Sequence, residues 1–302
     1  MTERADLDPP KLDAQSSPSS SESAPPSAGK KPPSNLAMRV LSALVAAPLI
    51  LALLYLGPNW AWLAFITAAA VVGSYELYGM LHPDDRLSQT IAVLETIGVL
   101  LVLWHYGMDA KILVAMMLAL PILSQLVVLA RLGDMRTAAL RLSSLSFGPL
   151  YVGAGMATLA LLKRDAGSDG PGFVVLALML SWLSDTGAYF AGRFLGKNKL
   201  YAAVSPKKTV EGAIGGLGGS VAGALLGSFG YLSSLPVSHA VALGLVGGAL
   251  GQAGDLGESL LKRSVGVKDS GGIVPGHGGI LDRVDALLVT GTIAYLYVLF
   301  VR

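Results

Sequence analysis

The sequence predicts an all-α, polytopic integral membrane protein with about nine transmembrane helices, and three observations support this fold class. Hydrophobic residues make up 53% of the 302-residue chain. Only 14% of the residues are charged, against about 25% in soluble domains, and residues 1–36 alone hold nine of these 42 charges. Apolar stretches long enough to cross a bilayer recur along the rest of the chain. A soluble protein of this size could not cover its surface with so few charges.

The first 36 residues differ from the rest of the chain. They contain seven of the sixteen prolines, a run of serines and no aromatic residue, so they bury too little apolar surface to offset the entropy lost on folding. We expect a disordered tail over residues 1–36 and a transmembrane domain over residues 37–302. A long acidic segment precedes the first apolar stretch, whereas a signal peptide has a short basic start, so no cleaved signal is expected.

Nine apolar stretches follow the tail, each close to the roughly 20 residues that cross a bilayer core. The first two are joined by only three residues, which predicts a tight helical hairpin, and the third is interrupted by Glu95. The seventh carries glycines at positions 215, 219, 223 and 227, a spacing typical of closely packed helices. The stretches lie near 39–56, 60–80, 90–106, 111–131, 143–162, 172–191, 210–231, 237–258 and 283–301.

The positions of basic residues support nine spans and predict the orientation of the protein in the membrane, because Lys and Arg accumulate in cytoplasmic loops. With the N-terminus inside, eighteen of the 22 basic residues fall in the tail or in cytoplasmic loops. Both long polar loops, near 192–209 and 259–282, then lie on the cytoplasmic side, and the C-terminus lies outside. These two loops carry most of the unusual chemistry in the chain, so we expect a catalytic site that faces the cytoplasm.

Composition excludes several kinds of site. The chain has no cysteine, so it contains no disulfide, zinc–thiolate site, iron–sulfur cluster or thiol nucleophile. Its net charge of +2 is small and implies no general affinity for nucleic acid.

Carboxylates gather at the ends of the last two apolar stretches. Asp255 and Glu258 lie three residues apart, as do Asp282 and Asp285, and on a helix this spacing places each pair on one face. Asp285 precedes an apolar run, at a depth where an ionised carboxylate costs about 2.5–3.5 kcal/mol unless it is compensated. Two acidic helix ends joined by one loop can converge, and clustered oxygen atoms suit Mg²⁺.

A glycine-rich loop joins these two helix ends, with five glycines between positions 271 and 279. Glycines let backbone N–H groups approach an anion, and the helix that follows favours negative charge at its start. We therefore expect a metal–phosphate site, although a flexible hinge would have the same composition. His277 is either a phosphate donor or a packing residue. The flanking basic residues either bind phosphate or simply pair with the carboxylates; they are Lys262, Arg263, Lys268 and Arg283.

The other polar loop follows Asp185, an acid inside an otherwise apolar stretch. It offers basic and hydroxyl groups able to hold a triphosphate or a lipid phosphate, at Ser205, Lys207, Lys208 and Thr209. The alternative is a loop whose basic residues only set the orientation of the protein in the membrane. Glu76 and Glu95 are further acids within apolar stretches, and each either supports the site or forms a packing hydrogen bond.

Two segments, 182–212 and 254–285, together carry a recognisable signature. The second reads Ser259-x-Leu261-Lys262-Arg263, then Lys268-Asp269, then His277-Gly278-Gly279-x-x-Asp282-Arg283-x-Asp285. The first contains Ser184-Asp185-Thr186-Gly187-Ala188-Tyr189 and Ser205-Pro206-Lys207-Lys208-Thr209. These motifs resemble those of the phosphatidate cytidylyltransferases, or CDP-diacylglycerol synthases, although Val274 stands where that family usually has Leu, Ile or Phe. The resemblance covers roughly residues 36–302 and leaves out the tail.

The resemblance implies a homodimeric enzyme of the cell inner (plasma) membrane. It would transfer CMP from CTP to phosphatidic acid for phospholipid biosynthesis, and it would require Mg²⁺ with a second cation such as K⁺ nearby. Asp255, Asp282 and Asp285 are the implied metal ligands and, with Lys262, the implied catalytic residues. The implied substrate-binding residues are Asp185, Ser205, Lys207, Lys208, Thr209, Ser259, Arg263, Lys268, Asp269, His277, Gly278, Gly279 and Arg283.

Three other functions remain open from the sequence. They are another CTP-dependent lipid transferase, a polyprenol kinase and a transporter. A transporter would carry acids spread at mid-membrane, whereas here they gather at two helix ends.

Overall fold

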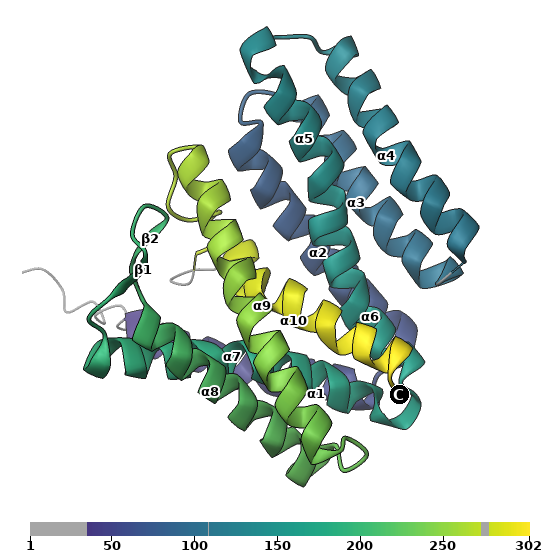
Figure 1. Ribbon diagram of the computed structural model, residues 1–302. Coiled ribbons are helices and arrows are strands. Elements are labelled where there is room, and N and C mark those ends of the chain that lie inside the picture. Colours follow the sequence, from purple (N-terminus) through teal and green to yellow (C-terminus); the bar gives the residue numbers. More distant parts are fainter. Residues whose placement is uncertain (1–34, 108, 273–277) are drawn as a thin grey trace, which may run out of the picture.

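The computed structural model describes residues 35–107, 109–272 and 278–302, and over these ranges the protein is built almost wholly from helices (Figure 1). Eight helical segments of the described residues are long and apolar enough to cross a membrane. The first helix, α1 (Asn35–Leu56), adds another 22 residues. The predicted all-α, polytopic class is confirmed. Residues 1–34, which make up nearly all of the predicted tail, lie outside the described residues.

The helices begin and end close to the predicted stretches. Their bounds are α1 (Asn35–Leu56), α2 (Asn59–Leu81), α3 (Arg86–Tyr106), α4 (Ala110–Ala130), α5 (Ala138–Gly148), α6 (Gly155–Asp165), α7 (Gly170–Leu195), α8 (Val210–Leu226), α9 (Val237–Ser264) and α10 (Leu281–Phe300). A π-helical turn, Pro149–Ala154, joins α5 to α6, so that Met135–Asp165 forms one continuous rod. Pro149 has no backbone N–H to continue the regular α-helical pattern, and widened turns of this kind are frequent at functional sites.

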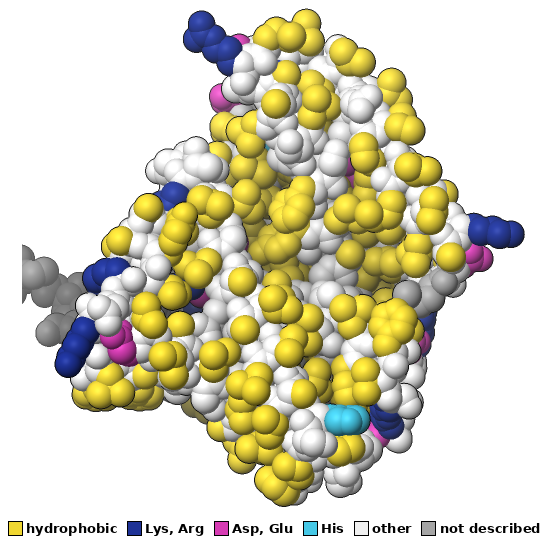
Figure 2. Space-filling view, viewed as in Figure 1, with side chains coloured by type: hydrophobic (Ala, Val, Ile, Leu, Met, Phe, Trp, Pro, Cys, Tyr) yellow, Lys and Arg dark blue, Asp and Glu magenta, His cyan; other side chains and the backbone are white. Residues whose placement is uncertain are grey.

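Connections between helices meet at two opposite ends of the bundle (Figure 1). At one end, the Nε of Arg263, near the end of α9, donates to the Val204 carbonyl, 3.4 Å away. At the other end, Lys163 Nζ in α6 donates to the Gly57 carbonyl between α1 and α2, at 2.7 Å. The two long polar loops near 192–209 and 259–282 therefore share one end of the molecule. Hydrophobic side chains cover most of the face seen in Figure 2, and charged side chains lie at its edges.

Glycines allow α7, α8 and α9 to pack at close range, as the predicted stripe requires. A Cβ atom on Gly223 of α8 would lie 2.9 Å from the Met179 carbonyl oxygen in α7. A Cβ atom on Gly244 of α9 would lie 2.5 Å from Val221 Cα in α8. Within a bilayer, helices gain little from burying apolar surface away from lipid, so backbone contact of this kind stabilises their association. The packing function of the glycine stripe is confirmed.

The polar loop after α7 contains a β-hairpin that the sequence analysis missed. Strands β1 (Lys199–Tyr201) and β2 (Ser205–Thr209) pair antiparallel. The Glu211 carboxylate, at the start of α8, anchors the approach to β1 by accepting hydrogen bonds from the backbone N–H groups of Lys197 and Asn198, at 3.1 and 3.2 Å. Strands of three and five residues that are mostly polar give no apolar alternation, which is the usual sequence signal of a strand.

Candidate active site

A cavity of about 380 Å³ lies between α7, the hairpin, α8 and α9. It receives cationic side chains from two elements, Arg193 of α7 and Lys207 and Lys208 of β2, and carboxylates from Asp185 of α7 and Asp255 of α9. The Lys208 ammonium lies 2.5 Å from Asp255 Oδ2. The cavity therefore presents positive charge to an anion and keeps carboxylates within the same space.

The start of α8 forms part of this cavity. Thr209, the last residue of β2, caps the helix by accepting a hydrogen bond from the Gly212 N–H at 3.1 Å through its hydroxyl. Threonine is a favoured cap because its hydroxyl satisfies one of the free N–H groups of the first turn. Both Thr209 and Gly212 line the cavity, so the structure assigns Thr209 a capping function beside the predicted phosphate site.

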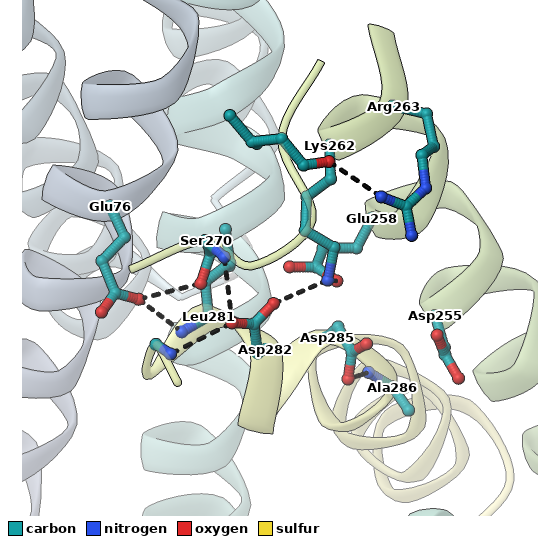
Figure 3. Close-up of polar contacts among 12 residues, drawn as sticks. Glu76, Asp255, Glu258, Lys262, Arg263, Ser270, Leu281, Asp282, Asp285 and Ala286 are labelled. Carbon is teal, nitrogen blue, oxygen red and sulfur yellow. Dashed lines mark hydrogen bonds and ion pairs between the residues drawn. The ribbon is translucent and has the colours of Figure 1, made fainter. Parts of the chain in front are cut away.

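A second group of carboxylates lies where α9 and α10 meet, next to this cavity. Figure 3 shows Asp285 of α10 and Asp255 of α9 on facing segments. Asp285 interacts electrostatically with Asp255, Glu258 and Asp185, and among the described residues it takes part in no ion pair. Its Oδ1 accepts a hydrogen bond only from the adjacent Ala286 N–H, at 2.7 Å. The carboxylate of Asp285 is thus partly buried beside like charges, and no cationic side chain of the described residues pairs with it.

Lys262 of α9 forms ion pairs with two further acids, Glu258 and Asp282. Its side chain is largely buried and donates hydrogen bonds to Glu258, one helical turn earlier, and to Asp282 Oδ1 at 2.6 Å. Asp282 Oδ2 in turn accepts hydrogen bonds from the backbone N–H groups of Ser270 and Gly279, each at 3.0 Å. Asp282 therefore ties both ends of the glycine-rich loop to α9.

The expected metal set of Asp255, Asp282 and Asp285 stays a prediction, and the contacts of Asp282 bear on it. Both oxygens of Asp282 have hydrogen-bond partners, and its carboxylate is turned toward Lys262 and Ser270 rather than toward Asp255 (Figure 3). Within the described part of the chain, no three histidine or acidic side chains are arranged to hold a metal ion. The simpler alternative is that these acids pair with Lys262, Arg263 and Arg283. Asp282 does pair with Lys262, but Asp255 pairs with Lys208 of the hairpin instead. Asp285 has no ion pair among the described residues.

The donor set of the remaining acids nevertheless fits a divalent cation. Asp255 and Asp285 supply carboxylate oxygens from two helices, and one oxygen of the buried Glu258, Oε1, has no hydrogen-bond partner. Hard cations such as Mg²⁺ bind oxygen ligands of this kind, and uncompensated buried carboxylates are costly without a counter-charge.

The other predicted residues are divided between the cavity and the loop. Arg263 joins the two polar loops, because it donates to the carbonyls of Val204 and Val267. Gly278 adopts a φ of +82°, a backbone conformation that favours glycine. Ser259 is partly buried on α9, Ser205 is partly buried on β2, and Lys268, Asp269 and Arg283 are exposed. His277 lies outside the described residues.

Two residues near the carboxylates were missed by the sequence analysis. Tyr151, in the π-helical turn, has a buried hydroxyl without a hydrogen-bond partner and interacts electrostatically with Asp285, Glu258 and Asp255. Ser270 is buried at the entrance of the glycine-rich loop. Neither could be found from spacing, because each reaches the site from an element whose position depends on the tertiary fold.

Comparisons with known proteins show the family of the chain. Residues 37–301 match the sequence profile of the Cytidylyltransferase family. The phosphatidate cytidylyltransferase of Staphylococcus haemolyticus is 34% identical over 258 residues, which cover 83% of this chain and 94% of that protein. The phosphatidate cytidylyltransferase of Staphylococcus aureus is 33% identical over the same shares. That of Synechocystis is 46% identical over 126 residues, which cover 41% of this chain and 42% of that protein. The chain belongs to the cytidylyltransferase family.

Proposed function

We propose that this protein is a phosphatidate cytidylyltransferase, which transfers CMP from CTP to phosphatidic acid and releases pyrophosphate. The observation that carries the proposal is the cavity in which Arg193, Lys207 and Lys208 face the carboxylates of Asp185 and Asp255 at one end of the helix bundle. Relatives that share about a third of its residues carry this activity in their names.

The reaction requires little proton transfer. A phosphate monoester has a second pKa near 6, so phosphatidic acid is largely dianionic at pH 7 and attacks without a general base. An oxygen of its phosphate forms a bond to the α-phosphorus of CTP, and the bond between that phosphorus and the bridging oxygen to the β-phosphate breaks. The electron pair leaves with pyrophosphate. The difficulty lies in bringing two polyanions together, so positioning and charge neutralisation provide most of the catalysis.

The cationic residues divide this task between them. Lys207, Lys208 and Arg193 hold the triphosphate in the cavity, and the start of α8 adds the favourable end of its helix dipole. Lys262, held between Glu258 and Asp282, keeps the glycine-rich loop in place. Phosphatidic acid reaches the same end of the bundle from the surrounding leaflet.

Mg²⁺ belongs to the proposal, with Asp255 and Asp285 as the residues that would hold it. When bound, the ion would neutralise phosphate charge during the transfer. A second cation such as K⁺ would use the unpartnered oxygen of Glu258. Asp282, expected from the sequence as a third ligand, instead holds the loop, and could join a metal only by giving up one of its present partners.

The distribution of basic residues supports the proposed orientation of the enzyme in the membrane. The two polar loops share one end of the bundle and carry many of the basic residues, so we place the active site on the cytoplasmic face of the inner membrane. We also expect a homodimer, which the resemblance to the family implies.

An activity assay tests the function. Purified protein in vesicles that contain phosphatidic acid should convert labelled CTP to CDP-diacylglycerol and release pyrophosphate, and chelation of divalent ions by EDTA should abolish turnover until Mg²⁺ is restored. Release of CDP instead of pyrophosphate would indicate a lipid kinase. Turnover with another lipid, but none with phosphatidic acid, would indicate a different CTP-dependent transferase. Either result would reject the proposal.

A further inference from the structure

Glu76 connects the N-terminal half of the chain to the glycine-rich loop. It lies on α2, five residues before the helix ends, and its side chain is only 4% exposed. A carboxylate at this depth is costly unless other groups bind to it and compensate its charge. Figure 3 shows its carboxylate directed at Ser270 and Leu281, on the two sides of the glycine-rich loop.

The contacts of Glu76 satisfy a helix terminus that has no cap of its own. Ile280 occupies the capping position of α10 and has no side-chain acceptor, so the first N–H of that helix needs another partner. Glu76 Oε2 accepts a hydrogen bond from the Leu281 N–H at 2.8 Å and another from the Ser270 hydroxyl at 3.3 Å. Within the described residues, Glu76 Oε1 has no hydrogen-bond partner. The carboxylate therefore caps α10 from a different helix.

Glu76 and Asp282 hold the loop from opposite sides. Asp282 accepts hydrogen bonds from the Ser270 and Gly279 N–H groups, while Glu76 accepts from the Ser270 hydroxyl and from Leu281. Asp282 lies in the first turn of α10 and Asp285 directly follows that turn, so whatever fixes Leu281 also fixes the orientation of both acids.

Two glycines of the loop are explained by the space that Glu76 occupies. A Cβ atom on Gly271 would lie 2.8 Å from Glu76 Oε1 and 3.0 Å from its Cδ, and all three of its nearest atoms belong to Glu76. A Cβ atom on Gly279 would overlap both Glu76 and Ser270. These glycines allow the loop backbone to lie directly against the carboxylate.

We propose that Glu76 is a positioning residue, whose side chain docks the glycine-rich loop and the first turn of α10 and thereby sets Asp285 for the reaction. The inference rests on the proposed function for its kinetic consequences. The docking itself is independent of that function, so a structural measurement can test it separately.

The first test compares Glu76→Ala with Glu76→Gln in the full-length protein. Gln retains a carbonyl oxygen that accepts the Leu281 N–H, whereas Ala leaves this N–H unsatisfied. We expect Glu76→Ala to increase hydrogen exchange in residues 268–272 and 278–285, with no change in α7 or α8, and to lower kcat on the order of 100-fold, as small misplacements of catalytic groups do. Glu76→Gln should restore protection from exchange and most of kcat.

The second test is a double-mutant cycle with Gly271. Gly271→Ala places a methyl group whose three nearest atoms all belong to Glu76. It should therefore lower kcat strongly in the wild-type background and less than about twofold in the Glu76→Ala background, where those atoms are removed. Gly79→Ala, three residues along α2 in open space, and Glu95→Ala, the other acid in an apolar stretch, serve as controls that should leave exchange in the loop unchanged.

Unchanged exchange in residues 268–272 and 278–285 of Glu76→Ala would overturn the proposal. It would also be overturned if the kcat of the double variant equalled the product of the two single effects, because the two side chains would then act independently. Loss of kcat in Glu76→Gln with normal protection of the loop would also overturn it, because that result assigns Glu76 a chemical function rather than a positioning one. An inactive wild-type protein would reject the proposed function but leave the exchange test intact.

Discussion

Two acids one helical turn apart have different surroundings. Asp282 bonds to Lys262 and to two backbone N–H groups, whereas Asp285 is partly buried and, among the described residues, accepts one local hydrogen bond. Their spacing predicted a shared face, and both do lie at the site. The sequence could not predict which of the two carboxylates accepts hydrogen bonds from other parts of the protein, because those donors come from a loop and from α9.

This difference gives a prediction for the two conservative variants. Asp285→Asn and Asp282→Asn should each reduce CDP-diacylglycerol formation on the order of 100-fold or more. Asp285→Asn removes a carboxylate charge from the reacting centre, whereas Asp282→Asn weakens the contacts that hold the glycine-rich loop in place. Only Asp282→Asn should increase hydrogen exchange at Ser270 and Gly279, since it weakens the contacts to the loop. Equal exchange in both variants would contradict the assignment of Asp282 to the loop.

Lys208 should act mainly on nucleotide binding. It lines the cavity and pairs with Asp255, so Lys208→Ala removes a cation that, in the proposed function, would contact the triphosphate. A charged hydrogen bond of this kind contributes about 1.5–3 kcal/mol, and we expect the KM for CTP to rise roughly tenfold or more, with a smaller change in kcat. Lys199→Ala, an exposed lysine of the same hairpin outside the cavity lining, should leave KM unchanged. If the KM for CTP rose in both variants, the effect would come from the overall charge of the hairpin and not from Lys208 itself.

At the scale of elements, hydropathy predicted the helices well. It did not predict two irregular elements that carry residues of the site. The nine apolar stretches each contain most of a helix or helical rod, because a bilayer core sets the length of each span. The π-helical turn that carries Tyr151 and the hairpin that carries Lys207 and Lys208 were not predicted. Both depend on backbone hydrogen bonds that hydrophobic periodicity does not report.

The contact between α7 and α8 gives a prediction about stability. A Cβ atom on Gly219 would lie 2.8 Å from the Leu183 carbonyl carbon, whereas Gly218 next to it faces open space. Gly219→Leu should therefore force the helices apart and destabilise the protein by about 1–3 kcal/mol or more. Gly218→Leu should have little effect. Thermal unfolding in detergent measures both, and equal melting temperatures would contradict the packing described above.

At the scale of the whole molecule, the orientation in the membrane can be tested because the chain has no cysteine. Ala202→Cys in the hairpin and Ser168→Cys between α6 and α7 each introduce one exposed thiol at opposite ends of the bundle. An impermeant thiol reagent added to intact cells should label Cys at position 168 and reach position 202 only after the membrane is opened. The reverse pattern would place the active site outside.

The hydrogen bond between Leu281 and Glu76 joins residues 205 positions apart, which has a consequence for biosynthesis. A ribosome delivers α2 to the membrane long before it synthesises α10, so Glu76 enters the bilayer without the group that it will bind. The earlier helices can insert and associate in the meantime, but the reactive centre is assembled only when the final span arrives. A nascent chain that stops before α10 would resemble the mature protein in most of its membrane-embedded mass and have no catalytic capacity.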